Sequence, residues 1–329
     1  MSRPSKGTTK PSGVAPVPEP SRTDVACAGE TMALLLPEPS APGDSPRLRV
    51  EIGGAESNVA VHLARAGRRA AWHSALGEDP FGHRIREVLT ASGVRCLVRT
   101  DPDRLTGLYM KEPGPGGTRV RYWRRGSAAS TLGPDDAARV WRSRPRIVHT
   151  TGITVALSDS ADALVGELLD GTRGPALRSF DVNHRPALHG PHNAGRLLEL
   201  ARRADIVFCG LDEALALWGT TSPRRLRELI EGPRWLVAKQ GAEGATAFHQ
   251  DRSWFQAAPE VEVVEPVGAG DAFAAGFLDG LLDGAPVPEC LARGAELAGT
   301  VLATDGDIPP HRTRAPGAWE TGGDPTTEV

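Results

Sequence analysis

Apolar residues between positions 25 and 303 follow two patterns that alternate along the chain. Short apolar runs, typical of buried strands, alternate with segments in which apolar residues return every three or four positions, as in helices. The patterns predict strands at 70–76, 146–150, 176–182, 205–208, 234–239 and 245–249, and helices at 81–92, 134–142, 159–170, 193–203, 211–218, 224–231 and 287–303. This alternation predicts an α/β fold with a mostly parallel central sheet flanked by helices.

Two segments interrupt this alternation. The apolar run 25–36 is expected to cross the sheet as its first strand, and residues 48–52 alternate as a second, less buried strand. Strands at 106–111 and 119–123 surround the Gly/Pro-rich loop 113–117 and predict a β-hairpin. These elements predict a small β-sheet, built from about 37–52 and 95–125, that stands off the main body as a lid.

Both ends of the chain are polar and rich in proline. Residues 1–23 contain Pro, Ser, Thr and Lys without an apolar segment, so they predict a disordered extension rather than a secretory signal. Residues 308–329 predict a flexible tail. The intervening residues, 24–307, are expected to form the folded domain.

Composition and charge exclude several classes of protein. The 329-residue chain carries a net charge of −3, which argues against a nucleic-acid or anionic-membrane partner. No apolar run approaches the roughly 18 to 20 residues that a membrane helix needs. The four cysteines lie far apart without a paired-cysteine motif, so the sequence predicts a reduced, cytoplasmic protein.

The first candidate for chemistry is the glycine-rich stretch that ends in Asp271. Residues 261–264 are expected to form a short strand, and helical spacing resumes after the stretch, where Gly276 and Gly280 would allow close packing. Free N–H groups at a helix start suit a phosphate or a developing negative charge. Asp271 beside them could accept a proton from a hydroxyl. An ordinary helix cap with a tight turn is the alternative.

A second glycine stretch, Gly53–Gly54, is followed at once by a helix of small residues. Paired glycines let a ligand approach the backbone, and Asn58 can donate and accept hydrogen bonds. A glycine hinge with a polar cap is the alternative here, and the dinucleotide fingerprint is absent. The two stretches lie more than 200 residues apart, yet in a parallel sheet both would follow strand C-terminal ends, where ligands bind.

Together the two stretches resemble the signatures of the ribokinase-like sugar kinases, the PfkB family. The first is carried by Gly53, Gly54, Asn58, Ala60, Gly67 and Gly77, and the second by residues 267–273. The resemblance covers about 25–307 and implies a ribokinase-like fold and ATP-dependent phosphorylation of an alcohol group. It implies that Asp271 is the general base and that the amides of Gly268, Ala269 and Gly270 form an anion hole.

The same resemblance implies where ATP and magnesium bind. ATP would lie over Lys239, Gly241 and Gly244, which match a Lys-x-Gly-x-x-Gly stretch of the family. Glu213 would lie near Mg²⁺, beyond its direct ligands. Gly210 replaces the Asn of the family's Asn-x-x-Glu, and a solvated glutamate on a helix face is the alternative for Glu213. Glu265-Pro266 replaces the usual Asp-Thr, which leaves a role for a monovalent cation open.

Within the family the sequence most resembles the 2-keto-3-deoxygluconate kinases, along 106–109, 122–130, 152–154 and 181–185. Arginine suits a sugar acid because its planar fork matches a carboxylate. The reaction would transfer phosphate to the acid's primary hydroxyl and give the 6-phosphate. The substrate-lining residues implied by the resemblance are Gly54, Asn58, Tyr109, Tyr122, Arg124, Ile153, Arg185 and Asp307.

Three alternatives stay open. A kinase of a neutral sugar or nucleoside (fructose, ribose or adenosine) would leave buried arginines unpaired, which costs free energy. A non-catalytic sugar-acid-binding module would not need an intact Gly-Ala-Gly-Asp motif. The gluconate and galactonate epimers differ only in the orientation of one hydroxyl, which the sequence does not resolve. Finally, an exposed lid edge predicts a homo-oligomer.

Overall fold

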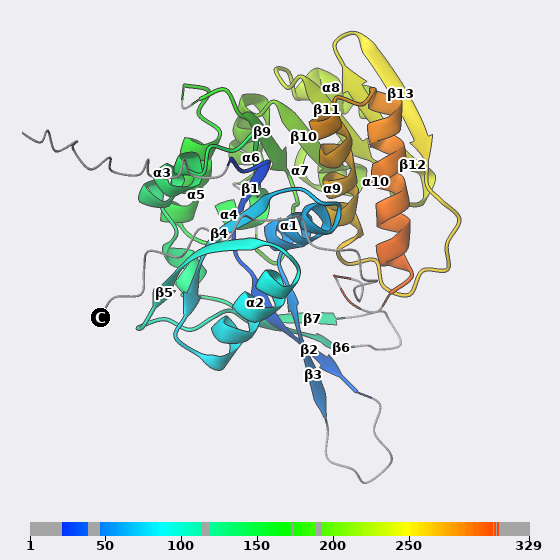
Figure 1. Cartoon of the computed structure of the whole chain (residues 1–329). Coiled ribbons are helices and arrows are strands. Elements are labelled where there is room, and N and C mark those ends of the chain that lie inside the picture. The colour runs from blue at the N-terminus through cyan, green and yellow to red at the C-terminus, as the bar shows by residue number, and fades with distance from the viewer. Residues whose placement is uncertain are drawn as a thin grey trace, which may run out of the picture.

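The computed structural model describes residues 22–38, 47–112, 119–172, 174–188, 193–304, 306 and 308. Within these residues the strands form a nine-stranded sheet with helices on both faces and a four-stranded sheet that projects from one end (Figure 1). The predicted α/β class, mostly parallel sheet and separate small sheet are therefore confirmed. The predicted extension 1–23 and tail 308–329 lie almost wholly outside the described residues.

The larger sheet is parallel through seven neighbouring strands, and its last two strands are antiparallel. Val25 of the central strand pairs with Ala70 on one side and Ile147 on the other. Its strands in spatial order are β13 (Arg252–Ala257), β12 (Gly244–His249), β11 (Trp235–Lys239), β10 (Ile206–Gly210), β9 (Leu177–Asp181), β8 (Ile147–Thr151), β1 (Val25–Ala28), β4 (Ala70–Gly77) and β5 (Arg95–Asp101).

Side-chain alternation along the strands builds a core on each face of this sheet. Val25 and Cys27 face one core, and Ala26 and Ala28 face the opposite side. The first face is covered by α1 (Ala55–Arg65), α2 (Pro80–Ala91), α9 (Ala269–Asp283) and α10 (Val287–Leu302). The second face is covered by α3 (Pro134–Arg142), α5 (Asp159–Leu168), α6 (Asn193–Arg203), α7 (Leu211–Trp218) and α8 (Pro223–Leu229).

The smaller sheet corrects the expectation of one strand over 25–36. That run forms two strands in different sheets, β1 and β2 (Met32–Pro37). The chain turns at Gly29, where a Cβ would lie 2.2 Å from the carboxyl carbon of Glu56. The order of the smaller sheet is β3 (Leu48–Gly53), β2, β6 (Leu108–Glu112) and β7 (Arg119–Trp123).

The boundaries of the lid also differ from those expected. The hairpin β6–β7 is confirmed, and its predicted tip 113–117 lies outside the described residues. However, β5 pairs in parallel with β4 of the larger sheet, so the segment 95–101 is not part of the lid. The strand lies at the edge of that sheet and is only half-buried, so its apolar pattern is weak.

The approach to Asp271 is irregular, contrary to the strand expected at 261–264. Residues 258–264 pair with no strand, and Val263 and Val264 are 58% and 59% exposed. The first glycine stretch ends β3, which belongs to the smaller sheet. Neither stretch therefore directly follows a strand of the larger sheet, because the first follows β3 of the smaller sheet and the second follows an irregular segment.

Helices α9 and α10 pack together through glycines, as the sequence predicted for Gly276 and Gly280. A Cβ at Gly276 would lie 2.5 Å from the carbonyl oxygen of Arg293, and one at Gly280 would lie 2.8 Å from Sγ of Cys290. The helices can approach this closely because neither position of α9 carries a side chain.

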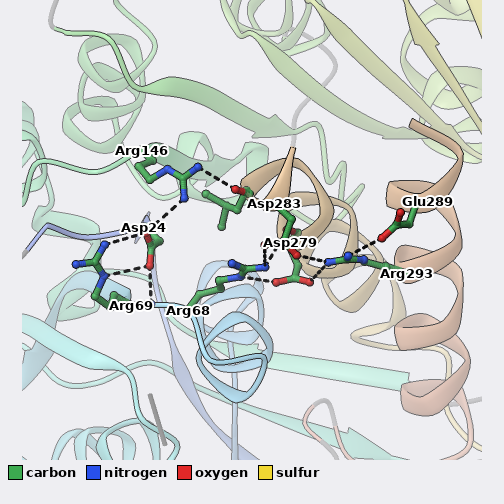
Figure 2. A network of polar contacts seen from close by, with 9 residues as sticks. Asp24, Arg68, Arg69, Arg146, Asp279, Asp283, Glu289 and Arg293 are labelled. Atoms are coloured by element: carbon green, nitrogen blue, oxygen red, sulfur yellow. Dashed lines mark hydrogen bonds and ion pairs between the residues drawn. The ribbon is translucent and has the colours of Figure 1, made fainter. Parts of the chain in front are cut away.

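Ion pairs hold the end of α9 remote from Asp271 (Figure 2). Arg68 contacts Asp279 at 2.6 Å and Asp283 at 2.7 Å. Arg293 of α10 contacts the same two carboxylates at 2.8 Å and 2.7 Å. The C-terminal half of α9 is thereby tied both to the turn after α1 and to α10. No helix within the described ranges is long and apolar enough to cross a membrane.

Candidate active site

The first turn of α9 carries the glycine-rich stretch predicted to form an anion hole. Gly268 caps the helix with φ of 89°, in the left-handed region that glycine adopts without strain. The helix begins at Ala269, so Gly270 and Asp271 lie in its first turn. The first N–H groups of a helix lack acceptors within the helix, and they carry its positive dipole end. This geometry suits an anionic oxygen.

A hydrogen bond joins the two glycine stretches. Asn58 Nδ2, on α1, donates to Asp271 Oδ2 at 2.8 Å across 213 residues of sequence. Burial raises the pKa of Asp271 to about 7, and the Asp181 carboxylate adds to the rise, against the lowering effect of Asn58, Arg185 and Lys239. A carboxyl that titrates near neutral pH is suited to accept a proton from a hydroxyl.

Lys239 lies beneath the start of α9. Its Nζ contacts Oδ1 and Oδ2 of Asp181 at 3.0 Å and 2.8 Å, and a Cβ on Gly270 would lie 3.3 Å from the same Nζ. Burial opposes the charge of Lys239, but Asp181 and Glu213 outweigh it and hold the pKa of the amine above its usual value. A fixed cation therefore lies close to the predicted anion hole.

Glu213, predicted to lie near magnesium, is close to this cation. Its Oε2 accepts a hydrogen bond from Gly210 N at 3.0 Å, and burial raises the pKa of its carboxyl. Arg185 Nη1 lies 4.0 Å from Glu213 Oε1, and the Arg185 side chain is 46% exposed. The site thus contains three carboxyl groups, from Asp181, Glu213 and Asp271, together with two cationic side chains.

The predicted nucleotide turn has two different kinds of glycine. A Cβ on Gly244, whose φ is 135°, would lie 2.1 Å from the carbonyl oxygen of Gln256. Gly244 is therefore required by the packing of β12 on β13. Gly241 has φ of 57°, and nothing lies within 4 Å of the point that a Cβ would occupy there. The backbone at Gly241 is open to a ligand, whereas Lys239 points away from it toward Asp181.

Arg124, a predicted carboxylate ligand, is buried and already has an acidic neighbour. Its Nη2 lies 2.5 Å from Glu30 Oε2, and Ser127 Oγ donates to Glu30 Oε1. Among the described residues, Arg124 Nε has no hydrogen-bond partner. The sequence argument that a neutral substrate would leave this arginine unpaired is therefore wrong for Arg124, because Glu30 balances its charge.

Two further predicted substrate residues, Tyr109 and Tyr122, lie in the smaller sheet and differ in their exposure. Tyr109 is buried against Met32 and Leu34, and its ring stacks on Tyr122 with centroids 5.8 Å apart. Tyr122 is more exposed and lies 5.8 Å from the Arg124 guanidinium. Tyr109 thus has a packing role in the smaller sheet, and Tyr122 presents the more accessible ring.

Gly54 and Ile153 occupy the starts of two helices. A Cβ on Gly54 would lie 2.4 Å from the carbonyl oxygen of Glu30, so glycine allows α1 to begin directly beside that loop. Ile153 belongs to the short helix α4 (Gly152–Val155), whose cap Thr151 accepts a hydrogen bond from Ile153 N at 3.1 Å. Asp307 lies outside the described residues.

Glu56 stabilises the start of α4, a role that the sequence did not predict. Its Oε1 accepts hydrogen bonds from Thr151 N at 3.0 Å, Thr151 Oγ1 at 2.8 Å and Thr154 Oγ1 at 2.7 Å. Burial raises the pKa of Glu56, against the hydrogen bonds of both threonines. One carboxyl group of α1 therefore holds the loop that follows β8.

Glu265, the departure from the family pattern, is engaged by the smaller sheet. Its Oε2 lies 3.4 Å from Nζ of Lys111, a β6 residue that is 2% exposed, and its Oε1 accepts a hydrogen bond from Val267 N at 3.2 Å. The smaller sheet is thus linked by an ion pair to the segment leading into the anion hole.

Sequence reasoning missed four acidic residues of the site, for related reasons. Asp181 ends a buried strand, a position at which ligands collect in parallel sheets, and this signal could have identified it. Glu30 is a charge inside an apolar run, and Glu56 is a charge in a helix of small residues; both are signals of a buried partner. The partners themselves are distant in sequence. Glu265 was noted only as a substitution.

Comparisons with known proteins agree with this geometry. The model of the pfkB family carbohydrate kinases matches residues 22–314. A 2-dehydro-3-deoxygluconokinase of Thermoproteus tenax is 37% identical over 78% of this chain and 81% of its own length. A 2-dehydro-3-deoxygalactonokinase of Haloferax volcanii is 35% identical over 85% of this chain and 91% of its own length.

A solved structure of similar length supports the same assignment. The crystal structure of a PfkB protein from a Polaromonas species superimposes with a TM-score of 0.77 at 35% identity, covering 85% of this chain and 96% of the other. The family model spans both glycine stretches, Asn58 and Asp271 included. The chain therefore belongs to the pfkB family of carbohydrate kinases.

Proposed function

We propose that the protein transfers the γ-phosphoryl group of ATP to the primary hydroxyl of 2-keto-3-deoxygluconate or its galactonate epimer. The observation that carries this proposal is the hydrogen bond from Asn58 to Asp271, at the first turn of α9. It brings an amide, a carboxyl group near neutral pKa and the N–H groups of a helix start to one place, where Ala269 N–H also donates to the carbonyl oxygen of Pro266 at 3.4 Å. The relatives named as kinases of the two epimeric acids support the choice of substrate.

Asp271 accepts the proton of the attacking hydroxyl in this mechanism. The amides of Gly268, Ala269 and Gly270 stabilise the charge that develops on the transferred group, because phosphoryl transfer depends mainly on positioning and electrostatics. Lys239 adds a fixed positive charge from below. Asn58 orients the carboxyl group of Asp271 and can also contact a substrate hydroxyl.

ATP binds with its phosphates at the start of α9 and its nucleoside near Gly241 and Gly244. Among the described residues, no group of three or more His, Cys, Asp or Glu side chains is arranged to hold a metal ion. This fits Mg²⁺, which keeps several waters and is bound by the phosphates with one or two carboxylates. We assign this role to Asp181, whose carboxylate also contacts Lys239, and to Glu213. Because Lys111 engages Glu265, we do not assign a monovalent cation there.

The carboxylate of the substrate is held by Arg185 and Arg124. Arg185 is half-exposed beside Glu213, so it can turn toward a ligand, and Arg124 Nε has no partner within the described ranges of the chain. Tyr122, Gly54 and Ile153 line the space between these arginines and Asp271. The smaller sheet closes over the sugar and excludes water, which protects ATP from hydrolysis.

A kinase of a neutral sugar is the second candidate. The pairing of Arg124 with Glu30 favours it, since the arginine has a counter-ion without an acidic substrate. Arg185 is half-exposed and stays in contact with water, so it does not require an acidic substrate either. The two candidates therefore differ in a measurable way: only an acid should depend on Arg185.

The test is an ADP-release assay with ATP and Mg²⁺. Candidate acceptors are both keto-deoxy acids, gluconate, fructose, ribose and adenosine, each with wild-type protein and with Arg185→Ala. We expect the highest kcat/KM for a keto-deoxy acid, and a KM about tenfold or more higher in the variant, because a charge-assisted hydrogen bond is lost. Turnover of a neutral sugar that is unaffected by the substitution would favour the second candidate.

Two controls complete this assay. Arg225→Ala removes an arginine of α8 that is 75% exposed and paired only at the surface with Glu228, so it should leave all kinetic constants unchanged. Asp271→Asn should bind ligands but release ADP ~10²–10⁴-fold more slowly. Binding of the acid with no turnover by the wild-type protein would indicate a non-catalytic binding module instead.

We place the reaction in the cytoplasm, where ATP is available and where the four free cysteines would remain reduced. We also expect copies of the chain to associate through the smaller sheet. Its edge strands are β3 and β7, and Trp123 at the end of β7 is 52% exposed. Sedimentation of the wild-type protein and of Trp123→Lys would reveal whether this edge mediates association.

A further inference from the structure

Glu30 lies in the loop between the two sheets, and sequence patterns gave it no function. It is buried, together with Arg124 and Ser127. Glu30 Oε1 accepts a hydrogen bond from the hydroxyl of Ser127, and Glu30 Oε2 lies 2.5 Å from Arg124 Nη2. Gly107 adds a further constraint, since a Cβ there would lie 2.9 Å from Oε1. The Glu30 carboxylate is therefore held on both oxygens.

The pairing uses only part of the guanidinium group. Arg124 Nε is buried and has no hydrogen-bond partner in the part of the chain that the structure describes, whereas Nη2 forms the ion pair with Glu30. A buried donor without an acceptor is costly and uncommon in native proteins. A ligand that supplies an acceptor would remove this cost, and a carboxylate is the group that matches the arginine fork.

The backbone of Glu30 lies beside the start of α1. The carbonyl oxygen of Glu30 is at the start of α1, 2.4 Å from where a Cβ of Gly54 would lie, and Asn58 is on the same helix. Four residues of helix rise about 6 Å. Asn58 contacts Asp271, so about one turn of α1 separates the backbone of Glu30 from the residue that contacts the proposed base.

We propose that Glu30 is a positioning residue that holds Arg124 at the start of α1, so that the unpaired Nε–H binds the carboxylate of a six-carbon sugar acid. The proposal rests on the proposed function. It makes Glu30 a determinant of specificity for acids, although Glu30 itself is negatively charged. Ser127 supports Glu30, and Tyr122 lies beside the guanidinium group at 5.8 Å.

Two effects of removing Glu30 have opposite signs, so the sign of the change decides between them. If Glu30 acted only as a neighbouring negative charge, Glu30→Gln would reduce repulsion and lower KM for the acid. If Glu30 positions Arg124, the same substitution lets the side chain move and raises KM. We expect KM for the keto-deoxy acid to rise about tenfold or more with kcat nearly unchanged, the signature of lost uniform binding.

The experiment measures kcat and KM for the keto-deoxy acid and for its neutral carboxamide, using wild-type protein, Glu30→Gln, Glu30→Asp and Ser127→Ala. The carboxamide KM should be the same in all four proteins. Glu30→Asp keeps the charge and should fall between wild type and Glu30→Gln, and Ser127→Ala should raise the acid KM by less. Glu51→Gln, in the exposed Arg49–Glu51 pair of the same sheet, is the matched control.

The outcomes separate this inference from the proposed function. If wild-type protein does not phosphorylate the keto-deoxy acid, the proposed function fails. If wild-type protein does so and Glu30→Gln leaves the acid KM unchanged or lower, the role of Glu30 is overturned. A parallel rise in KM for acid and carboxamide also overturns it, because that pattern indicates general disruption. Should Glu30→Gln not fold, Glu30→Asp and Ser127→Ala decide by the same criteria.

Discussion

Asp271 combines two properties that ordinarily exclude each other, deep burial and a need to ionise. Burial raises its pKa to about 7, and the hydrogen bond from Asn58 limits the rise. Near neutral pH the carboxyl group is therefore partly ionised and close to the value at which a base is most effective. Lys239 and Arg185 lower the pKa as well, so the site sets the protonation state through fixed charges.

We expect Asp271→Asn to lower kcat by ~10²–10⁴-fold, the usual contribution of a positioned base. The amide can still accept the hydrogen bond of Asn58, so the fold should persist. ADP release under saturating substrates measures the effect. An unchanged kcat would show that Asp271 is not the base.

The same substitution should increase stability at neutral and alkaline pH. The pKa of Asp271 rises from 3.8 in the unfolded chain to about 7 in the folded protein. The folded state thus holds the proton more tightly, and stability falls as pH rises through this window. Urea unfolding of wild type and Asp271→Asn should agree near pH 4 and diverge progressively up to about pH 7, above which the difference stays constant, with the variant more stable. Equal stabilities at every pH would contradict the assigned pKa.

Asn58 offers an independent test of this pKa. Its hydrogen bond lowers the pKa of Asp271, so Asn58→Ala should move the acidic limb of the kcat/KM profile to higher pH. The measurement is kcat/KM between about pH 5 and about pH 9, a range that brackets the expected pKa. The position of the limb is independent of any loss of substrate contact, which changes only the plateau. A limb at unchanged pH would remove Asn58 from this role.

Helix α9 carries Asp271, the proposed base, and its packing on α10 depends on glycines at the contact. A Cβ at Gly276 would collide with backbone atoms of Arg293 and Gly294, which cannot rotate away. Gly195 in α6 is the opposite case, because nothing lies within 4 Å of a Cβ there. The two glycines occupy helices of the same protein but differ in their surroundings.

This contrast makes a paired prediction. Gly276→Ala should destabilise the protein by about 1–3 kcal/mol through overpacking. Gly195→Ala should be neutral or stabilise it by up to ~1 kcal/mol, because alanine is the better helix former. Urea unfolding followed by circular dichroism measures both. Equal effects of the two substitutions would show that the α9–α10 contact is not tight.

Elements with a strong apolar pattern were predictable, and those at sheet edges were not. Buried strands such as β8 and β10 and amphipathic helices such as α6 appear at their expected positions. The edge strand β13 and the short helix α4 were missed, because a half-exposed strand and a single turn carry little periodicity. Residues 261–264 show the converse error, since apolar residues there stay exposed without a partner strand.

The residues of the candidate site also fall into a group that the sequence could predict and a group that it could not. Residues inside motifs, such as Asn58 and Asp271, could be predicted because the glycines around them indicate the local backbone conformation. The pairs Arg124–Glu30 and Lys239–Asp181 could not, because each joins segments far apart in the chain. A single sequence contains no pattern that links two such distant residues, because they come together only in the folded structure.

At the scale of the whole molecule, the ion pairs of Figure 2 connect α9, α10 and the turn after α1. Asp279 is central because it contacts both Arg68 and Arg293, and its side chain is 16% exposed. A partly buried network is screened less by salt than isolated surface pairs. The network lies at the end of α9 remote from Asp271, so it should affect stability rather than catalysis.

We expect Asp279→Asn to lower the free energy of unfolding by about 1 kcal/mol, because two half-buried arginines lose a partner. Glu228→Gln is the control, since the Arg225–Glu228 pair is 75% and 54% exposed and should contribute almost nothing. Urea unfolding at low and high NaCl concentration measures both, and the effect of Asp279→Asn should shrink in salt. A loss of kcat without a loss of stability would contradict the assigned structural role.

The hydrogen bond between Asn58 and Asp271 also has a consequence for biosynthesis. Its two members are separated by 213 residues, and α9 is the penultimate helix of the described chain. A ribosome-bound chain can complete the smaller sheet and most of the larger one before Asp271 emerges. Such a nascent chain lacks the proposed base and the proposed anion hole. Under the proposed mechanism, phosphoryl transfer requires that residues 268–271 have been synthesised, and a product terminated before them cannot consume ATP by this route.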